Sequence, residues 1–511
     1  MPVLFDNIPG NVRVPFFYAE FRPGGTPYQS NARLLLIGQK LSTGAAPAGQ
    51  PIMVREAQAA GLGGAGSMLA QMDAVARRNA PLAEIWWLPL DDAQAGVAAT
   101  GKIAVGTPSL TQAQVLTIYI AGQRVRIPVL VGDTDEDIAA NLVAEINKTP
   151  GLPVTAAVNG TEASEVDLTA RHKGTLGNFI LIERGLLEED GNLGHTGSGL
   201  ELTITAMANG AGDPDITSAL ANLGEDEFDW IVLPYSDATN LGAISDYFSD
   251  VAGTWSWYKQ LYGHAIVPHT GTVGDLQTFG LAQNRQHLSY FPCRKFLSPP
   301  WEVAAAVGAR LVKHLSTPPE LSRPLQTLEL VGIKGPRAKA DRLTRTDRQT
   351  LYYSGISGYY VHADGSVRID RIVTGYRVNA WGDPDATYLD IETMAQSMYG
   401  IRYLRQKVTN AHGRQALADS NPGRLPHITT PTDIRNTLIH GYADLVALGV
   451  FEGLDLFARD VVVERDPVDP NRVNASLPLD HVNQLRVLAA AAVNYMQRRE
   501  PADTLDIAVP A

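Results

Sequence analysis

Residues 456–496 read LFARDVVVERDPVDPNRVNASLPLDHVNQLRVLAAAAVNYM, and this stretch decides how the rest of the chain is interpreted. The three valines at 461–463 predict a strand, and the two Asp-Pro pairs in residues 466–471 predict a turn. The apolar residues at 485–495 then predict a second strand. A strand that is apolar on both faces needs a partner on each side. The stretch therefore predicts strands that are completed by another copy of the chain.

The opposite end of the chain has a similar character. Residues 12–21 read VRVPFFYAEF, an extended aromatic segment that Pro15 interrupts. Prolines at five positions within residues 1–28 prevent a long helix there. We therefore predict an N-terminal extended arm over residues 1–28 that adds a strand to a neighbouring subunit.

Between these ends, buried strands alternate with helices. The segments with strand character are ARLLLIGQK (32–40), AEIWWLPL (83–90), FDWIVLPY (228–235), HAIVPH (264–269) and HLSYFPC (287–293). Continuous apolar runs of this length are typical of strands buried on both faces, and helix-like segments separate them. The pattern predicts a doubly wound α/β sheet in a discontinuous central domain, 29–94 plus 216–388.

Residues 95–215 interrupt the central domain with a different sequence pattern, in which apolar and polar residues alternate. This block contains VLTIYIAGQRVRIPVLV (115–131), two alternating runs joined at Ala121-Gly122, which predict a hairpin. Thr134 and Asp137 have the spacing of a capping box before a helix. We predict a small inserted outer α+β domain.

The end of the chain has the size of a further domain. Helical patterns at about 391–409 and 430–448 predict an α+β C-terminal domain over 389–483, followed by a C-terminal arm over 484–511. Arg402, Arg405 and Lys407 on the first helix are a candidate surface toward a partner.

Composition narrows the class of protein. The chain has 511 residues, 45% hydrophobic and 19% charged, with a net charge of −12, which is typical of a globular protein and argues against binding nucleic acid. No apolar run reaches the roughly 18 residues that span a bilayer, and no signal-peptide pattern opens the sequence. Cys293 is the only cysteine, so no intrachain disulfide can form. We predict that it is a small residue of the core.

Two glycine motifs raise the alternative of a nucleotide-binding α/β enzyme. GLGGAG (61–66) fits G-x-G-x-x-G, but no strand directly precedes it and no acidic residue follows at the required distance. GVAATGKI (96–103) lacks the Ser or Thr of a P-loop and leads into a strand-like run. Both are better interpreted as a helix entry and a linker.

Other chemistry-bearing patterns also fail. In DTDED (133–137) the glycine of a calcium loop is replaced by Ile138, so these acids fit a helix start better. The histidines are scattered, and H-E-x-x-H and G-x-S-x-G are absent. We predict no catalytic, cofactor or metal residues.

The ordered set of segments resembles the tail sheath protein of contractile-tailed bacteriophages, in particular the Mu-like tail sheath family. The resemblance covers nearly the whole chain. It is carried by GSMLAQMDAVARRNAPLAEIWWLPL (66–90), GDTDEDIAANLVAEINK (132–148), VTAAVNG (154–160), LTARHKGTLGNFI (168–180), ITAMANGAGDPDI (204–216), TTPTDIRNTLIHGYADLVALGVFEGLD (429–455) and DVVVERDPVDPNRVNASLPLDHVNQLRVLAAAAVNYM (460–496).

The resemblance implies a structural subunit of a contractile sheath and a subtilisin-like central fold without protease activity, because the G-T-S-x-A serine motif is absent. It implies stacked hexameric rings around a tail tube, contraction that drives the tube through the host envelope, and contacts with tube, baseplate and tail terminator proteins. The location would be the virion, and the host cytoplasm during assembly. The sheath of a phage-derived injection particle is an alternative.

The resemblance also implies which residues join subunits. The predicted arm residues are Val12, Val14, Phe16, Phe17, Tyr18, Phe21, Leu485, Val487, Leu488, Val493 and Tyr495. The predicted acceptor strand is Val461, Val462 and Val463.

Overall fold

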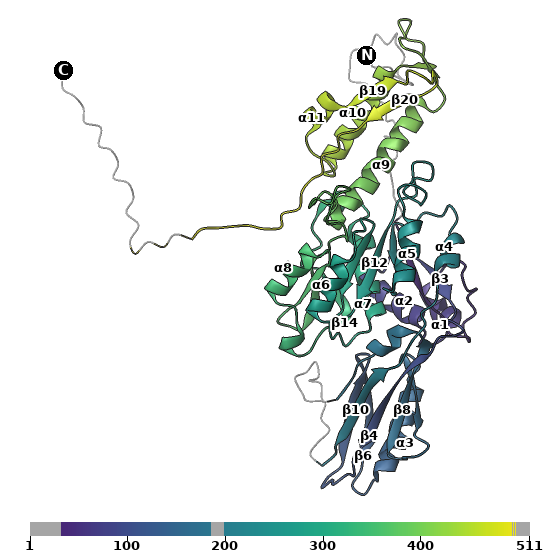
Figure 1. Cartoon of the computed structure of the whole chain (residues 1–511), viewed down its shortest axis with the longest axis vertical. Helices are drawn as coiled ribbons and strands as arrows, with labels where there is room; N and C mark the ends of the chain where they lie inside the picture. Colours follow the sequence, from purple (N-terminus) through teal and green to yellow (C-terminus); the bar gives the residue numbers. More distant parts are fainter. Residues whose placement is uncertain (1–31, 185–198, 493, 495, 497–511) are drawn as a thin grey trace, which may run out of the picture.

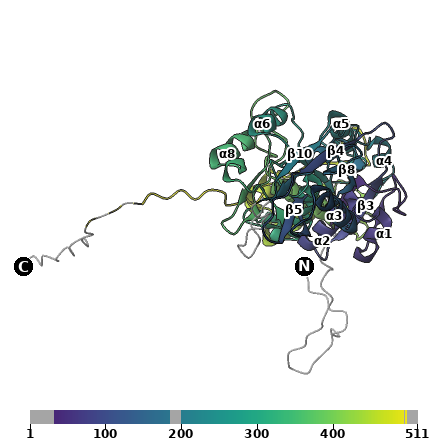
Figure 2. The same cartoon turned by 90° about the horizontal axis from the view of Figure 1, so that it is seen from below.

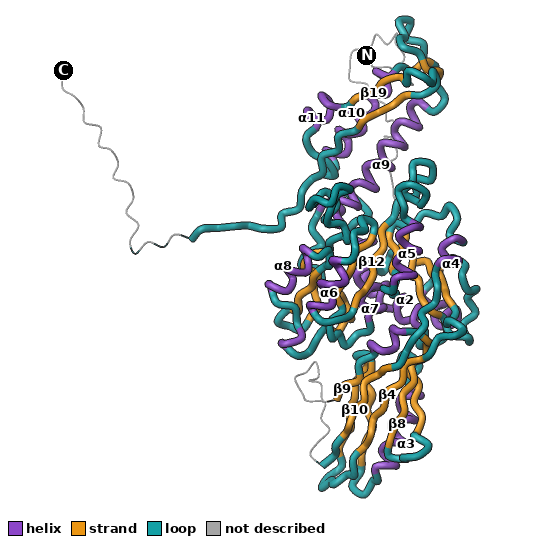
Figure 3. Tube along the Cα trace, in the orientation of Figure 1, coloured by secondary structure: helices purple, strands orange, loops and turns teal. Residues whose placement is uncertain are grey.

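A computed structural model of the chain describes residues 32–184, 199–492, 494 and 496. Figure 1 shows three tiers along the long axis: a β-rich tier built by the inserted block, a central α/β tier, and a slender tier built by the C-terminal helices. In both Figure 1 and Figure 2 the last described residues before the grey trace leave the body sideways. Figure 3 shows that strands dominate the lowest tier, whereas helices and strands mix in the other two.

The central tier is built on a six-stranded sheet. Its strand order is β13-β12-β11-β1-β3-β2, and all neighbours are parallel except β2 with β3. The strands are β1 (Arg33–Gln39), β2 (Ile52–Met53), β3 (Glu84–Leu90), β11 (Trp230–Val232), β12 (His264–His269) and β13 (Leu288–Pro292). Residues 34–37 of β1 are fully buried, as the continuous apolar run predicts.

Helices also build this tier. They are α1 (Ala59–Gly63), α2 (Met68–Asn79), α4 (Thr217–Ala221), α5 (Ala238–Tyr247), α6 (Val273–Leu281), α7 (Pro300–His314) and α8 (Arg345–Tyr353). Of these, α2 and α7 contact strands of the sheet. The side chains of Ser67, Asp237 and Thr272 cap the amino ends of α2, α5 and α6. A smaller sheet, order β14-β16-β15, completes the tier with β14 (Glu329–Lys334), β15 (Gly358–Val361) and β16 (Ser366–Arg371).

The inserted block forms two sheets, in the orders β10-β4-β8-β7 and β6-β5-β9. The elements are β4 (Ala98–Val105), β5 (Gln114–Ile120), β6 (Gln123–Val129), α3 (Asp135–Lys148), β7 (Val154–Val158), β8 (Glu165–Lys173), β9 (Ile182–Arg184) and β10 (Leu202–Ala208). The predicted hairpin is confirmed, with Ala121 and Gly122 both at positive φ between β5 and β6. The capping box of Thr134 and Asp137 is confirmed as well.

The C-terminal tier has a hydrophobic core of its own. It contains α9 (Ile391–His412), β17 (Ala416–Leu417), β18 (Ile428–Thr429), α10 (Pro431–Ala447), α11 (Leu454–Asp460), β19 (Val462–Arg465) and β20 (Val473–Ser476). Its buried apolar residues form a cluster separate from the one that runs through the central and inserted tiers. The prediction of two long helices is confirmed, and the fold as a whole is a multidomain α/β and α+β arrangement.

One carboxyl group in the central core gives a pH-dependent prediction. Glu302 on α7 is buried, and burial raises its pKa to about 8, against the opposing charge of Arg78. The unfolded chain releases this proton near pH 4.5, so the native state loses stability as the pH rises from there to about 8. We expect Glu302→Gln to increase the free energy of unfolding at pH 8.5 by on the order of a few kcal/mol, and so to raise the melting temperature. At pH 5 we expect a smaller change in both quantities.

The control for this prediction is Glu329→Gln, which changes an exposed carboxyl group on β14. Thermal unfolding of the three proteins at both pH values measures the effect. A gain from Glu302→Gln that is equal at pH 5 and pH 8.5 would contradict the assignment.

Candidate inter-subunit site

The long helix α9 joins the central and C-terminal tiers. Its first half contributes Ile391, Ala395 and Met398 to the core of the central tier. Its second half contributes Tyr403 and Leu404 to the core of the C-terminal tier. A single helix that is buried in two cores in succession fixes their relative position.

Aromatic stacking organises the core of the C-terminal tier. The ring of Tyr442 lies 3.8 Å from that of Phe457 and 5.3 Å from that of Phe451, nearly parallel to both. The hydroxyl of Tyr442 donates to the backbone oxygen of Glu452 at 2.7 Å. Gly400 on α9 allows this packing, because a Cβ there would lie 2.4 Å from the ring of Phe451. The core therefore gives the tier a defined shape.

The hairpin of β19 and β20 lies on this core. Val462 pairs with Ser476 and Arg465 pairs with Val473. The carboxylate of Asp466 holds the turn by accepting from the backbone amides of Val468 and Asp469, both at 2.9 Å, and these hydrogen bonds lower its pKa to about 2. Among the residues that the structure describes, β19 pairs with β20 alone, so its other edge is open to a further strand.

The structure corrects the bounds of the predicted strands, while the acceptor and donor roles stay predictions. Val461 lies before the strand, directly after α11, and is buried in the core, whereas Val462 and Val463 lie in β19. The partner of β19 within the chain is β20, and residues 485–492 form no strand. The short run VNAS carries little strand signal, and residues 485–492 of the more apolar run that follows pair with no strand in the described part of the chain.

After the hairpin, the chain returns along the first half of α9. His481 hydrogen-bonds Ser397 at 2.9 Å, and the backbone oxygen of Val482 accepts from Gln396 at 2.8 Å. Burial lowers the pKa of His481, against the opposing charge of Asp480, which favours a neutral imidazole here. The segment is thus held against α9 until it reaches the central tier.

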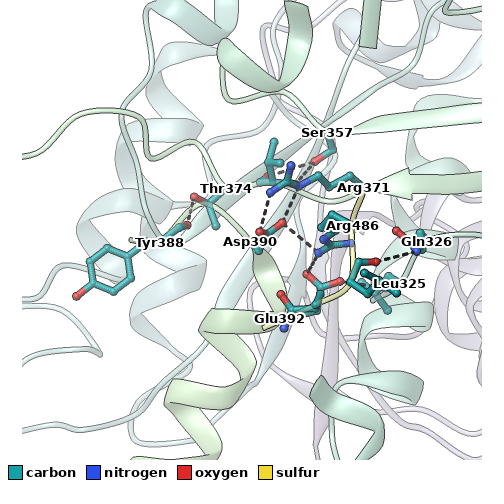
Figure 4. Close-up of polar contacts among 12 residues, drawn as sticks. Leu325, Gln326, Ser357, Arg371, Thr374, Tyr388, Asp390, Glu392 and Arg486 are labelled. Atoms are coloured by element: carbon teal, nitrogen blue, oxygen red, sulfur yellow. Dashed lines mark hydrogen bonds and ion pairs between the residues drawn. The ribbon is translucent and has the colours of Figure 1, made fainter. Parts of the chain in front are cut away.

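An ion-pair network ends this return path at Arg486 (Figure 4). The Nη2 atom of Arg486 lies 2.7 Å from Glu392 and 3.1 Å from Asp390. Arg371 of β16 binds the same Asp390 in a bidentate pair at 2.8 and 2.7 Å. Glu392 is fully buried, and burial raises its pKa while Arg486 opposes that rise. We name the set Arg371, Asp390, Glu392 and Arg486 the C-terminal anchor.

Directly after the C-terminal anchor the chain leaves the body. Val487 and Leu488 are 80% and 83% exposed, in a segment that Figure 1 shows extending away from all three tiers. The backbone oxygen of the preceding Leu485 accepts from Gln326 at 3.3 Å, although its side chain is also exposed. The predicted arm residues Val493 and Tyr495 lie outside the described residues.

A second ion-pair cluster lies where the first strand begins. The backbone amide of Arg33 donates to Asp229 at 2.9 Å, and Asp229 pairs with Arg402 of α9 at 2.5 Å. Arg402 also pairs with Glu227 at 2.6 Å. We name the set Arg33, Glu227, Asp229 and Arg402 the N-terminal anchor. The predicted arm residues Val12, Val14, Phe16, Phe17, Tyr18 and Phe21 precede it and lie outside the described residues.

The N-terminal anchor removes Arg402 from the predicted partner surface on α9, whereas Arg405 and Lys407 are exposed. The side chain of Arg402 is only 6% exposed and points to the central tier. Lys407 pairs with Asp444 at 2.8 Å, and Arg405 hydrogen-bonds Gln260 at 3.0 Å. Neither anchor can be predicted from the sequence, because no local sequence pattern distinguishes a buried arginine from a solvated one.

The motifs of the nucleotide-binding alternative have structural roles. Gly101 and Lys102 lie inside β4, where Lys102 pairs with Glu165 at 2.7 Å. Cys293 is buried, and burial raises the pKa of its thiol, so it is not a reactive thiolate. Over residues 32–184 and 199–492, no group of three acidic, histidine or cysteine side chains has the arrangement of a metal site. Within the same ranges, no helix is long and apolar enough to cross a bilayer.

Comparison with known proteins defines the class. A family model for the phage tail sheath protein central domain matches residues 209–374, which include β11, β12 and β13 of the central sheet. The central tier is therefore that of a phage tail sheath protein.

A full-length relative defines the family. The chain is 34% identical over 500 residues to the Mu-like prophage FluMu tail sheath protein of Haemophilus influenzae, which covers 96% of this chain and 99% of the relative. The chain thus belongs to the Mu-like tail sheath family, and it is a structural sheath subunit and not an enzyme.

Solved structures of sheath proteins align with most of the chain at low identity. A sheath tail protein from Listeria innocua is 12% identical, with a TM-score of 0.48, and covers 89% of this chain and 93% of its own. One from Desulfitobacterium hafniense is 10% identical, with a TM-score of 0.46, over 91% and 100%. A chain from the contracted helical sheath of the anti-feeding prophage is 10% identical, with a TM-score of 0.46. The alignment covers 95% of this chain and 100% of that chain.

Proposed function

We propose that this subunit polymerises into a helical sheath of stacked hexameric rings around a tail tube, and that the polymer contracts to drive the tube through a host envelope. Residues 1–28 and 484–511 serve as arms that add strands to neighbouring subunits, with β19 as an acceptor edge. Two observations on the described residues support this most: β19 has one edge that pairs with no strand, and the apolar residues Val487 and Leu488 after Arg486 are exposed.

Within this proposal, the chain is divided into three domains and two arms. The body consists of a central domain, 29–94 plus 216–388, with an inserted outer domain at 95–215, and a C-terminal domain at 389–483. The strand order β13-β12-β11-β1-β3 supports a doubly wound, subtilisin-like central sheet, since the chain adds β3 on one side of β1 and the later strands on the other.

Exchanged strands suit a sheath that changes shape. Backbone hydrogen bonds between an arm and a foreign sheet edge do not depend on the orientation of the bodies. The bodies can rotate and repack while the arms keep them connected. Each copy gives an arm and receives one, which is a head-to-tail contact that generates an open helical polymer.

We expect the purified protein to form tubes. Negative-stain electron microscopy at rising protein concentration measures this directly, and size-exclusion chromatography gives the fraction of polymer. A protein that remains monomeric at all concentrations, with and without added tube protein, would contradict the proposed function.

The partners of such a sheath are the tail tube, baseplate and tail terminator proteins. The sheath of a phage-derived injection particle would use the same polymer and differ only in the particle that carries it.

A further inference from the structure

We propose that α9 is the element that links the two arms within one subunit, because it holds the root of each arm through a buried ion-pair cluster. The proposal rests on the proposed function of the arms. It goes further by assigning positioning roles to Glu392 and Arg402, which sit on one helix and belong to the two different anchors defined above.

The root of the C-terminal arm is fixed near the amino end of α9. Glu392, the second residue of the helix, has a fully buried carboxylate that binds Arg486 at 2.7 Å. The backbone amide of Leu325 donates to the other oxygen of Glu392 at 2.9 Å, so the carboxylate is held from the central tier as well. Val487, the next residue after Arg486, is 80% exposed. The arm therefore becomes free of the body immediately after its contact with α9.

The root of the N-terminal arm is fixed further along the same helix. Arg402 is 6% exposed and binds both Asp229 and Glu227, and its Nη2 donates to the backbone oxygen of Tyr262 at 2.9 Å. Asp229 accepts from the backbone amide of Arg33, the first residue of β1. Residues 1–31 are joined to the body at this strand, so tension on them acts on β1 and on Asp229.

The spacing on α9 makes the helix a rigid connector. Glu392 and Arg402 are ten residues apart, which corresponds to about 15 Å along a helix. Most residues between them are buried, with Ala395 and Met398 in the central core and Tyr399 in the C-terminal core. A buried helix does not stretch, so the distance between the two roots is set by α9 and not by the loops of the body. A pull on one arm is then transmitted to the other through a single element.

Breaking either cluster separates one arm from α9 and leaves residues 1–31 and 487–511 unchanged. Loss of the Arg486 charge leaves Glu392 buried without its cation, and loss of the Arg402 charge leaves the buried Asp229 without its cation. Arg486→Met and Arg402→Met keep much of the side-chain volume, and Arg486→Lys restores a charge. The matched control is Lys148→Met, which removes a surface ion pair with Glu145 in the inserted tier.

The test measures the distance between the two roots in the full-length monomer. Spin labels at Ala32→Cys and Leu485→Cys report it by double electron–electron resonance, because the backbone of Leu485 is still held by Gln326 while its side chain is exposed. The native Cys293 is buried and does not compete for the label. We expect one narrow distance distribution in the parent and in Lys148→Met, a distribution at least twofold broader in Arg486→Met and Arg402→Met, and partial recovery in Arg486→Lys. Circular dichroism identifies a variant that fails to fold, in which case the other variant decides.

Tube formation separates this inference from the proposed function. Arg486→Met is expected to yield tubes whose helical repeat varies from tube to tube, whereas the parent yields one repeat. Equal distance distributions in the parent and both methionine variants would overturn the inference even if the parent forms tubes. A parent that forms no tubes would overturn the sheath proposal, while the distance measurement would still decide whether α9 fixes the two roots.

Discussion

Removal of residues 487–511 is expected to abolish tube formation and to leave the folded subunit intact. The deletion begins directly after Arg486, so the C-terminal anchor and the return path along α9 remain complete. The first removed side chains, Val487 and Leu488, are exposed and apolar, so the monomer loses little buried surface. Electron microscopy and size-exclusion chromatography measure the polymer, and thermal unfolding shows that the melting temperature is unchanged.

A pair of single substitutions controls this deletion. Leu488→Asp places a charge on the proposed donor strand, and we expect it to reduce the yield of tubes by at least tenfold, because burying an unpaired carboxylate in an inter-subunit sheet is unfavourable. Val131→Asp makes the same change at an exposed valine in the inserted tier, and we expect a normal yield. Normal tubes from the deletion variant would show that the arm does not join subunits.

Tyr442→Ala is expected to unfold the C-terminal tier while the central tier stays folded. The substitution leaves a cavity between Phe451 and Phe457 in a small separate core, at a cost of about 3–5 kcal/mol. The loss acts on the platform that holds β19, so we also expect Tyr442→Ala to form no tubes. Tyr442→Phe keeps the stacked ring and loses only the hydrogen bond to Glu452, at a cost of about 1 kcal/mol.

The positions of the tryptophans allow the two tiers to be followed separately. All seven lie between Trp86 and Trp381, and the C-terminal tier has none. The fluorescence transition of Tyr442→Ala should therefore match that of the parent, while hydrogen exchange in residues 430–476 becomes fast. A fluorescence midpoint that falls together with the protection of these residues would show that the two cores unfold as one unit.

Local patterns predicted the elements whose partners lie in the same subunit. The run of apolar residues in β1 is continuous because the strand is buried on both faces. Ala121-Gly122 predicts the turn between β5 and β6, because a two-residue hairpin needs positive φ angles. The strand β20 is not predictable from its local pattern, because it is short and mostly polar, whereas the strongly apolar run at 485–495 has the stronger strand signal. Local sequence indicates that a segment forms a strand, but it does not indicate whether the partner strand lies in the same subunit or in another one.

The two anchors could not be predicted because their partners are far apart in the chain. Arg402 and Asp229 are separated by 173 residues, and Arg486 and Glu392 by 94. An arginine near other basic residues on a helix is typical of a solvated surface, and Arg402 is close in sequence to Arg405 and Lys407. Only the packing of α9 between two tiers shows that these charges are buried and paired.

The measurement that tests the account most directly is a cryo-electron microscopy structure of tubes assembled from the full-length protein. The account predicts that residues 484–495 of one copy add a strand to the C-terminal domain of a neighbour, beside the open edge of β19. Residues 484–495 that instead fold back onto their own subunit, or tubes in which β19 has no foreign strand, would contradict it.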